Sequence, residues 1–368
     1  MAAEFESAMR ERPGSAVTEP PSELLSRVSA LATSRRRPLT RAAYLEGILA
    51  GQRTILARAI TLIESSRESD RLLAEQIVED CLPHCGNSIR VGITGIPGAG
   101  KSCLIETLGR YLTEERGEKV AVLAIDPSSQ ISGGSILGDK TRMVTLAASP
   151  LAFIRPSPSR GSFGGVAQRT REAMLLCEAA GFRNIVVETV GVGQSETAVH
   201  GMVDFFLLVL IAGAGDELQG IKRGVMELAD VVLINKADGS NQRAAERARA
   251  EAEHALHFFP ASASNWTPLA LTCSAHTGTG VRELWHRILE HSALTRSNGS
   301  LALHRQNQMR RWMHEIIEQG LRQRFDHHPA VRDRIALVEA QVACGETTSF
   351  RAARMLLEAY SNGIAARD

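Results

Sequence analysis

The sequence lacks three features that would point to particular classes of protein. Its 42 Lys and Arg residues nearly balance its 41 Asp and Glu residues, so a formal net charge of +1 provides no general attraction to nucleic acid or to anionic membranes. No apolar run approaches the length of about 18 residues that a membrane-spanning helix needs. The six cysteines are scattered over 368 residues, which favours reduced thiols over a disulfide framework. We therefore expect a soluble, cytoplasmic protein that binds neither nucleic acid nor membrane.

The ends of the chain differ in character from its middle. Residues 1–40 lack the apolar segment of a secretory signal and carry glutamates, unlike a mitochondrial transit peptide, so we interpret them as a flexible tail. Apolar residues at helical spacing predict an N-terminal helical region over 41–87. Residues 296–368 follow a polar hinge and predict three more helices, the last one short. Because such helices bury little apolar surface alone, we expect them to pack on the core or on a second copy, and we favour a dimerisation arm that forms a homodimer.

Residues 88–295 alternate short apolar runs with helical patterns. Runs this short and uninterrupted, separated by helices, predict a mostly parallel sheet that is buried on both faces and flanked by helices. The fold class is therefore α/β, and ligands of such sheets bind beyond the carboxyl ends of the strands. The expected strands are 89–94, 120–125, 152–154, 185–188, 205–210, 231–235 and 269–273.

A glycine-rich loop follows the first expected strand and opens a helix, which is the setting of a P-loop. The pattern is G-x-x-x-x-G-K-S, whose glycines let backbone N–H groups point at nucleotide phosphates. We expect Lys101 to reach the β- and γ-phosphates, as a catalytic group, and the Ser102 hydroxyl to ligate Mg²⁺. The predicted nucleotide-binding residues of this segment are Gly95, Pro97, Gly98, Ala99, Gly100, Lys101, Ser102 and Cys103.

Two acidic residues stand at ends of expected strands. Asp126 can hold Mg²⁺ directly or through water, and the alternative is that it only caps the following turn. Glu188 stands three residues before Gly191, as a Walker-B-like carboxylate stands before a glycine that senses the γ-phosphate. No glutamine directly follows that glycine, although Gln194 could position water. We therefore expect slow intrinsic hydrolysis that a partner accelerates.

Two polar loops are candidate switches, with plain structural loops as the alternative. Residues 132–143 crowd glycines before Asp139, as in loops that become ordered around phosphate. Residues 213–224 combine acidic, amide and basic side chains and suit a third switch and a docking surface for a partner. The candidate residues of that loop are Asp216, Gln219 and Lys222.

An N-K-x-D motif follows the expected strand 231–235. Its aspartate, Asp238, can accept hydrogen bonds from guanine N1–H and the N2 amine, which adenine does not offer in that arrangement. GTP and GDP are therefore the predicted nucleotides. The predicted base-site residues are Asn235, Lys236 and Asp238, with Ser274 and Ala275 closing the pocket through the Ala275 amide on guanine O6.

These motifs together resemble the methylmalonyl-CoA mutase-associated GTPases, the MeaB/ArgK-type G proteins. The resemblance runs from about residue 44 to the end and rests on residues 95–102, 124–129, 133–143, 155–159, 188–196 and 215–222. It implies a SIMIBI-type G domain, a C-terminal dimerisation arm and a partner that is an adenosylcobalamin-dependent acyl-CoA mutase. The implied role is a chaperone whose GTP binding and hydrolysis gate cofactor loading and expel damaged cofactor. The resemblance also places Asp126, Asp139 and Glu188 at magnesium and switch positions, Asn235 at guanine, and Asp216–Lys222 at the mutase.

One departure and two other functions stay open. Cys103 stands where threonine is expected, which we predict alters helix packing more than phosphate binding. Cys81, His84 and Cys85 would form a transient site if the chain were a metallochaperone GTPase that delivers nickel or cobalt. An ATP-dependent protein kinase is the third reading, and the N-K-x-D motif argues against it.

Overall fold

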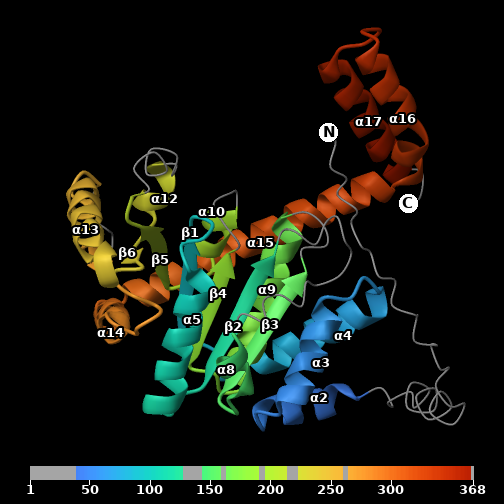
Figure 1. Ribbon diagram of the computed structural model, residues 1–368. Helices are drawn as coiled ribbons and strands as arrows, with labels where there is room; N and C mark the ends of the chain where they lie inside the picture. The colour runs from blue at the N-terminus through green and yellow to red at the C-terminus, as the bar shows by residue number, and fades with distance from the viewer. Residues whose placement is uncertain are drawn as a thin grey trace, which may run out of the picture. The chain divides into compact units, whose positions relative to one another are not determined.

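The central feature of the computed structural model is a seven-stranded sheet (Figure 1). The structure describes residues 39–126, 143–158, 163–189, 195–213, 223–259 and 264–365. The strand order is β3-β2-β4-β1-β5-β6-β7, and each neighbouring pair is parallel, which confirms the predicted fold class. The strands are β1 (Ile89–Gly95), β2 (Val120–Asp126), β3 (Ala152–Pro158), β4 (Asn184–Thr189), β5 (Phe205–Ile211), β6 (Val231–Asn235) and β7 (Leu269–Thr272).

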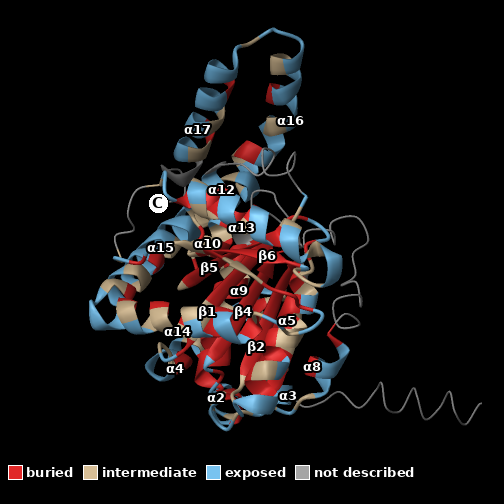
Figure 2. Cartoon of the chain, turned by 60° about the vertical axis from the view of Figure 1, so that its left-hand side comes forward, coloured by how far each residue is buried: buried red, intermediate tan, exposed pale blue. Residues whose placement is uncertain are grey.

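The sheet is buried because helices cover both of its faces. Every residue of β4 and β6 is buried, and in β5 only the last residue is partly exposed, as Figure 2 shows in red. This burial explains why the strands read as unbroken apolar runs rather than as alternating ones. The helix α10 (Ser195–His200) lies very close to β1, because a Cβ at Gly92 of that strand would lie 2.9 Å from the Val199 side chain.

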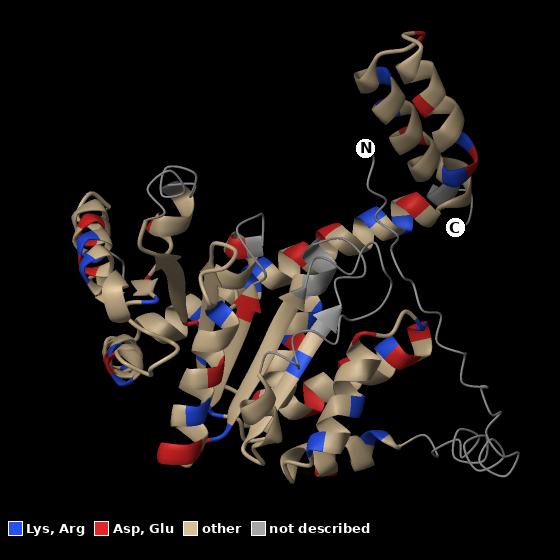
Figure 3. Ribbon diagram, in the orientation of Figure 1, with Lys and Arg blue, Asp and Glu red and all other residues tan. Residues whose placement is uncertain are grey.

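Two groups of helices pack on the sheet. The helix after the phosphate loop, α5 (Lys101–Arg110), contacts α8 (Val144–Ala148) and α14 (Val281–Ser297). On the other face, α9 (Phe163–Ala179) contacts α10 (Ser195–His200), α15 (Ser300–His327) and the N-terminal helices. Acidic and basic side chains are interspersed along α13 (Figure 3), where Arg249 pairs with Glu246 and Glu253. The elements are α5 (Lys101–Arg110), η2 (Tyr111–Glu115), α8 (Val144–Ala148), α9 (Phe163–Ala179), α10 (Ser195–His200), α12 (Arg223–Glu227), η3 (Gly239–Asn241), α13 (Gln242–Leu256) and α14 (Val281–Ser297).

Helices also precede and follow the sheet-forming part of the chain. Before it come α2 (Arg41–Leu49), α3 (Arg53–Ile63), α4 (Glu68–Cys81) and the short turn η1 (Leu82–His84). After it come α15 (Ser300–His327), α16 (Pro329–Ala343) and α17 (Ser349–Ala365). The last helix has 17 residues and is longer than the short helix that the sequence predicted. No helix within the described ranges has the length and hydropathy needed to cross a membrane.

The strand register brings the predicted motifs to one edge of the sheet. Ile93 of β1 lies beside Glu188 of β4, and Ala124 of β2 lies on the other side of that glutamate. Because parallel strands end at the same edge, the phosphate loop after β1, Asp126 at the end of β2 and Glu188 near the end of β4 emerge together.

Candidate nucleotide site

The phosphate loop has a backbone that only glycine fits at two positions. Gly95 has φ 153°, and a Cβ there would lie 2.1 Å from the carbonyl oxygen of Val209 on β5. Gly100 has φ 87°, and a Cβ there would lie 2.7 Å from Nδ2 of Asn235. The two glycines therefore let the loop lie directly against β5 and against the guanine motif.

Lys101 folds back over the loop that precedes it. Its Nζ donates to the carbonyl oxygens of Gly95 at 2.8 Å and Ile96 at 3.1 Å, and the residue is only 7% exposed. Burial lowers the pKa of the Lys101 ammonium, while the Glu188 carboxylate opposes that shift. An ammonium has three donors, so Nζ keeps one for a phosphate oxygen.

Ser102 and Glu188 meet at the start of α5. The Ser102 hydroxyl donates to Oε1 of Glu188 at 2.8 Å, and Glu188 is 5% exposed at its place in β4. A hydroxyl and a carboxylate oxygen side by side are hard ligands of the kind Mg²⁺ prefers, so these residues fit the metal that the sequence predicted. Asp126 ends β2 at the same edge, and its metal role stays a prediction.

Several predicted residues lie outside the described ranges. These include the candidate switch, water-positioning and partner-contact residues, so their roles remain predictions. They are Asp139, Gly191, Gln194, Asp216, Gln219 and Lys222.

Asn235 connects the guanine motif to the phosphate loop. Its Nδ2 donates to the carbonyl oxygen of Ala99 at 2.7 Å, and its Oδ1 accepts the N–H of Ala275 at 3.0 Å. We predicted that the Ala275 N–H contacts guanine O6. In the structure this N–H donates to Oδ1 of Asn235, a buried side chain at the end of β6, and its contact with guanine stays a prediction.

The carboxylate of Asp238 accepts a hydrogen bond from the Ser274 hydroxyl. Lys236 adopts a left-handed conformation with φ 60°, which turns the chain so that the N–H of Ala237 donates to the carbonyl oxygen of Cys273 at 3.0 Å. Thr277 donates its N–H to the same Ser274 hydroxyl at 3.2 Å. These contacts fix Asp238 and the loop after β7 as one unit on the base side of the site.

Two residues of α5 take part in the site although no motif marked them. The Thr107 hydroxyl donates to the carbonyl oxygen of Ala275 at 2.6 Å, so α5 holds the base-side loop. Oε1 of Glu106 accepts the N–H groups of Thr145 at 3.0 Å and Leu146 at 3.1 Å, which anchors α8 to the same helix. Both contacts depend on tertiary packing, which residue spacing does not reveal. Cys103, the departure from the expected pattern, is exposed on α5.

The cysteine cluster at the end of α4 is arranged as a structural turn. The Cys85 thiol lies 3.1 Å from the carbonyl oxygen of Cys81 and 3.3 Å from that of Leu175, and can donate to either. Burial raises the pKa of Cys81 to about 11 and that of Cys85 to about 12, so both stay thiols. Across the described ranges, no three His, Cys, Asp or Glu residues are placed to hold a metal ion. This arrangement counts against a nickel site at Cys81, His84 and Cys85.

The parallel sheet, its phosphate loop and the adjoining N-K-x-D motif define the class of the protein as a P-loop GTPase. Comparison with known proteins narrows this class to one family. The family model described as "Methylmalonyl Co-A mutase-associated GTPase MeaB" matches residues 56–330, and the chain belongs to that family.

Individual relatives agree with this assignment. GTPase ArgK of Escherichia coli is 51% identical over 269 residues, which cover 73% of this chain and 81% of the relative. The mouse protein named "Methylmalonic aciduria type A homolog, mitochondrial" is 45% identical over 326 residues, covering 86% of this chain and 78% of the relative. A solved structure of a "LAO/AO transport system kinase" is 38% identical with a TM-score of 0.68, and the match covers 87% of this chain and 97% of that one.

Proposed function

We propose that this GTPase is the chaperone of an adenosylcobalamin-dependent acyl-CoA mutase, either methylmalonyl-CoA mutase or a close relative. GTP binding and hydrolysis would gate loading of the mutase cofactor and protect or reactivate the mutase. The observation that carries this proposal is the match of residues 56–330 to a family described as associated with methylmalonyl-CoA mutase. The cysteines of the described ranges are free, which fits action in the cytoplasm.

The phosphate side of the site supports hydrolysis of GTP. Lys101 would bind the β- and γ-phosphates by exchanging its contacts with the Gly95 and Ile96 carbonyls for phosphate oxygens. Ser102 and Glu188 would hold Mg²⁺, which neutralises charge that develops on the transferred phosphoryl group. Gln194 would orient water, and Gly191 and Asp139 would respond to the γ-phosphate. Because no glutamine directly follows Gly191, we expect slow intrinsic hydrolysis that the mutase accelerates.

The base side of the site supports selection of guanine. Asp238 would accept N1–H and the N2 amine, and its bond from Ser274 holds the carboxylate in one orientation. A base without those donors would leave the held carboxylate unpaired, which costs affinity. The loop that contains Asp216, Gln219 and Lys222 would contact the mutase as the third switch.

The C-terminal helices support a homodimer. Their exposed apolar side chains on α15 recur at the helical spacing of one face, and α16 and α17 expose further large apolar residues. An exposed apolar surface of this kind marks a protein interface, and a second copy offers the same stripe to pair with. The exposed apolar residues on α15 are Leu303, Met309, Met313, Ile316, Ile317 and Leu321.

The test is a pull-down from native lysate with the purified chain and a non-hydrolysable GTP analogue. We expect an acyl-CoA mutase subunit to be retained with the analogue, and the purified mutase to accelerate GTP hydrolysis. The Lys101→Ala variant is the matched control, since it should lose the nucleotide-dependent retention. Capture of no mutase, together with a hydrolysis rate that purified methylmalonyl-CoA mutase leaves unchanged, would contradict the proposal.

A further inference from the structure

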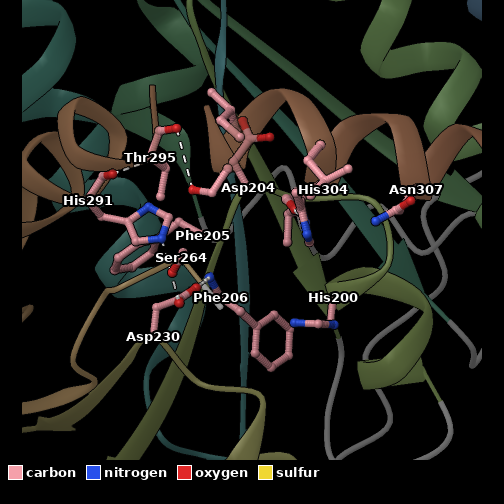
Figure 4. Close-up of a pocket in the computed structure, with 14 residues that line it drawn as sticks. His200, Asp204, Phe205, Phe206, Asp230, Ser264, His291, Thr295, His304 and Asn307 are labelled. Atoms are coloured by element: carbon pink, nitrogen blue, oxygen red, sulfur yellow. Dashed lines mark hydrogen bonds and ion pairs between the residues drawn. The ribbon is translucent and has the colours of Figure 1, made fainter. Parts of the chain in front are cut away.

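A second pocket lies at the amino ends of β5 and β6, whereas the phosphate loop follows the carboxyl end of β1. Figure 4 shows residues that line this pocket. Its volume is about 310 Å³, within the range of small-molecule sites. Asp204 and Asp230 immediately precede β5 and β6 there, and α10, α14 and α15 contribute His200, His291 and His304. The pocket therefore gathers five titratable side chains that the nucleotide site does not use.

The charge of Asp204 is already neutralised. Its Oδ1 accepts a hydrogen bond from Nε of Arg305 at 2.8 Å, and its Oδ2 accepts one from Nη2 of Arg305 at 2.6 Å. Oδ2 also accepts a hydrogen bond from the backbone N–H of Arg90 at 2.9 Å. Burial works against ionisation, but the Arg305 hydrogen bonds outweigh it and hold the pKa of Asp204 below its usual range. Asp204 and Arg305 thus form a closed pair at the wall of the pocket.

Asp230 has no such partner. Its Oδ2 accepts the N–H of Phe206 at 2.8 Å, and its Oδ1 lies 3.7 Å from Nε2 of His291. Burial raises the pKa of Asp230 to about 7 and lowers the pKa of His291 to about 4. The imidazole is therefore neutral at pH 7, and none of the described residues that line the pocket is Lys or Arg.

The other walls offer neutral acceptors and apolar surface. The His200 ring lies edge-on to Phe206, with centroids 5.6 Å apart, and its centroid is 6.3 Å from that of His304. Burial and the nearby His304 lower the pKa of His200 to about 4, so this ring is also neutral at pH 7. Leu301 adds an apolar wall. An anion would meet Asp230 without a facing cation, which disfavours phosphate or carboxylate ligands.

We propose that this pocket binds a small organic cation whose N–H groups donate to Oδ1 of Asp230 and to a neutral imidazole. The carbon skeleton of the ligand packs on Phe206 and Leu301. The Asp230 side chain is only 22% exposed. The cation supplies the positive partner that this partly buried carboxylate lacks, and an opposite charge nearby favours its ionised form. This site is independent of the role proposed for the nucleotide site.

Binding depends on pH through Asp230. The titratable groups that face it are His291 from α14, His304 from α15, His200 from α10 and Asp204 at the start of β5, while Arg305 is directed at Asp204. Between pH 6 and pH 8 the carboxyl of Asp230, whose pKa burial raises to about 7, loses its proton. The affinity for a permanently charged ligand therefore rises about tenfold over this range, in step with the ionised fraction of Asp230.

The test is titration calorimetry of the full chain with three matched probes, namely benzamidinium, benzamide and benzoate. We expect saturable heat with benzamidinium alone, tighter binding at pH 8 than at pH 6, and proton release on binding at pH 6.5 when buffers of different ionisation enthalpy are compared. Equal binding of benzoate, no heat with benzamidinium, or no proton release would each overturn the proposal.

The Asp230→Asn variant removes the charge and keeps an oxygen to accept the Phe206 N–H. Its affinity for benzamidinium should fall at least about tenfold and lose its pH dependence, while GTP binding stays unchanged. Benzamidinium binding that is as tight in Asp230→Asn as in the unaltered chain overturns the proposal. If this variant does not fold, the proton release measured on the unaltered chain decides the question.

Discussion

The side chain of Asn235 ties the N-K-x-D motif to the phosphate loop through its 2.7 Å hydrogen bond to the carbonyl oxygen of Ala99. The two segments are 136 residues apart in sequence, and the amide is 1% exposed. Its other end accepts the Ala275 N–H, so one side chain fixes three loops of the site. Asn235 thus positions the groups on both sides of the nucleotide.

Replacement of Asn235 by alanine should weaken the whole site. Asn235→Ala leaves the Ala99 carbonyl and the Ala275 N–H without their partner, at a cost of about 2–3 kcal/mol in unfolding free energy. We expect GTP affinity to fall at least about tenfold in calorimetry. The control is Asn298→Ala, which removes an exposed asparagine that also uses both polar ends, on Ser264 and Ser300. Equal GTP affinities of the two variants would contradict the role of Asn235 in holding the nucleotide site together.

Exchange of Asp238 should change the choice of base. Asp238→Asn replaces an acceptor by an amide, which suits the O2 of xanthine better than the N2 amine of guanine. We expect weaker GTP binding and a relative gain for xanthosine triphosphate in a competition assay. Ser274→Ala, which frees the carboxylate and the Thr277 N–H but leaves the acceptor in place, should weaken GTP binding without that gain. An unchanged base preference in Asp238→Asn would refute the assignment of Asp238 to guanine.

Thr107 should control the release of nucleotide. Thr107→Val keeps the shape of the side chain and removes its hydrogen bond to Ala275, which loosens the base-side loop by about 1 kcal/mol. We expect GDP release, followed with a fluorescent analogue, to accelerate about fivefold. Thr107→Ser keeps the hydroxyl and should release GDP at the original rate. Similar rates in Thr107→Val and the unaltered chain would contradict this role.

Because the carboxyl of Glu172 on α9 has a raised pKa, the free energy of unfolding of the chain should fall as the pH rises. Burial raises the pKa of its carboxyl to about 7, although Gln168 donates a hydrogen bond at 3.0 Å. The folded state then holds a proton that the unfolded state has lost, so stability falls between about pH 4.5 and pH 7. Glu172→Gln should gain about 1–2 kcal/mol over the unaltered chain in denaturant unfolding at pH 8 and less at pH 5.

The matched control for this pH effect is Glu79→Gln, at an exposed position of α4. It should unfold like the unaltered chain at both pH values. A gain in Glu172→Gln of the same size at pH 5 and pH 8 would contradict a raised pKa of Glu172.

The sequence predicted the elements whose causes are local. Each of the seven predicted runs became a strand, and in β4, β5 and β6 burial on both faces accounts for their nearly continuous apolar sequence. The phosphate loop could also be predicted from the sequence, because Gly95 and Gly100 adopt backbone conformations that few other residues tolerate. The motif strings also carried the family assignment, which the family model over residues 56–330 confirms.

Contacts between distant segments could not be read in this way. The bond from Thr107 to Ala275 and the direction of the Ala275 N–H depend on how α5 and the loop after β7 pack, which no spacing encodes. The length of α17 was underestimated although Phe350, Leu357 and Ile364 extend its apolar pattern at helical spacing. The pocket near Asp230 was missed because its histidines come from three helices and form no motif.

The most direct test of the central claim is release of phosphate from GTP with Mg²⁺, measured for the unaltered chain and for Lys101→Ala. We expect Lys101 to bind the β- and γ-phosphates, so the unaltered chain should turn over GTP measurably and the variant should lose at least about a hundredfold of that turnover. Turnover that persists in Lys101→Ala, or a folded chain that neither binds nor hydrolyses GTP, would contradict the account.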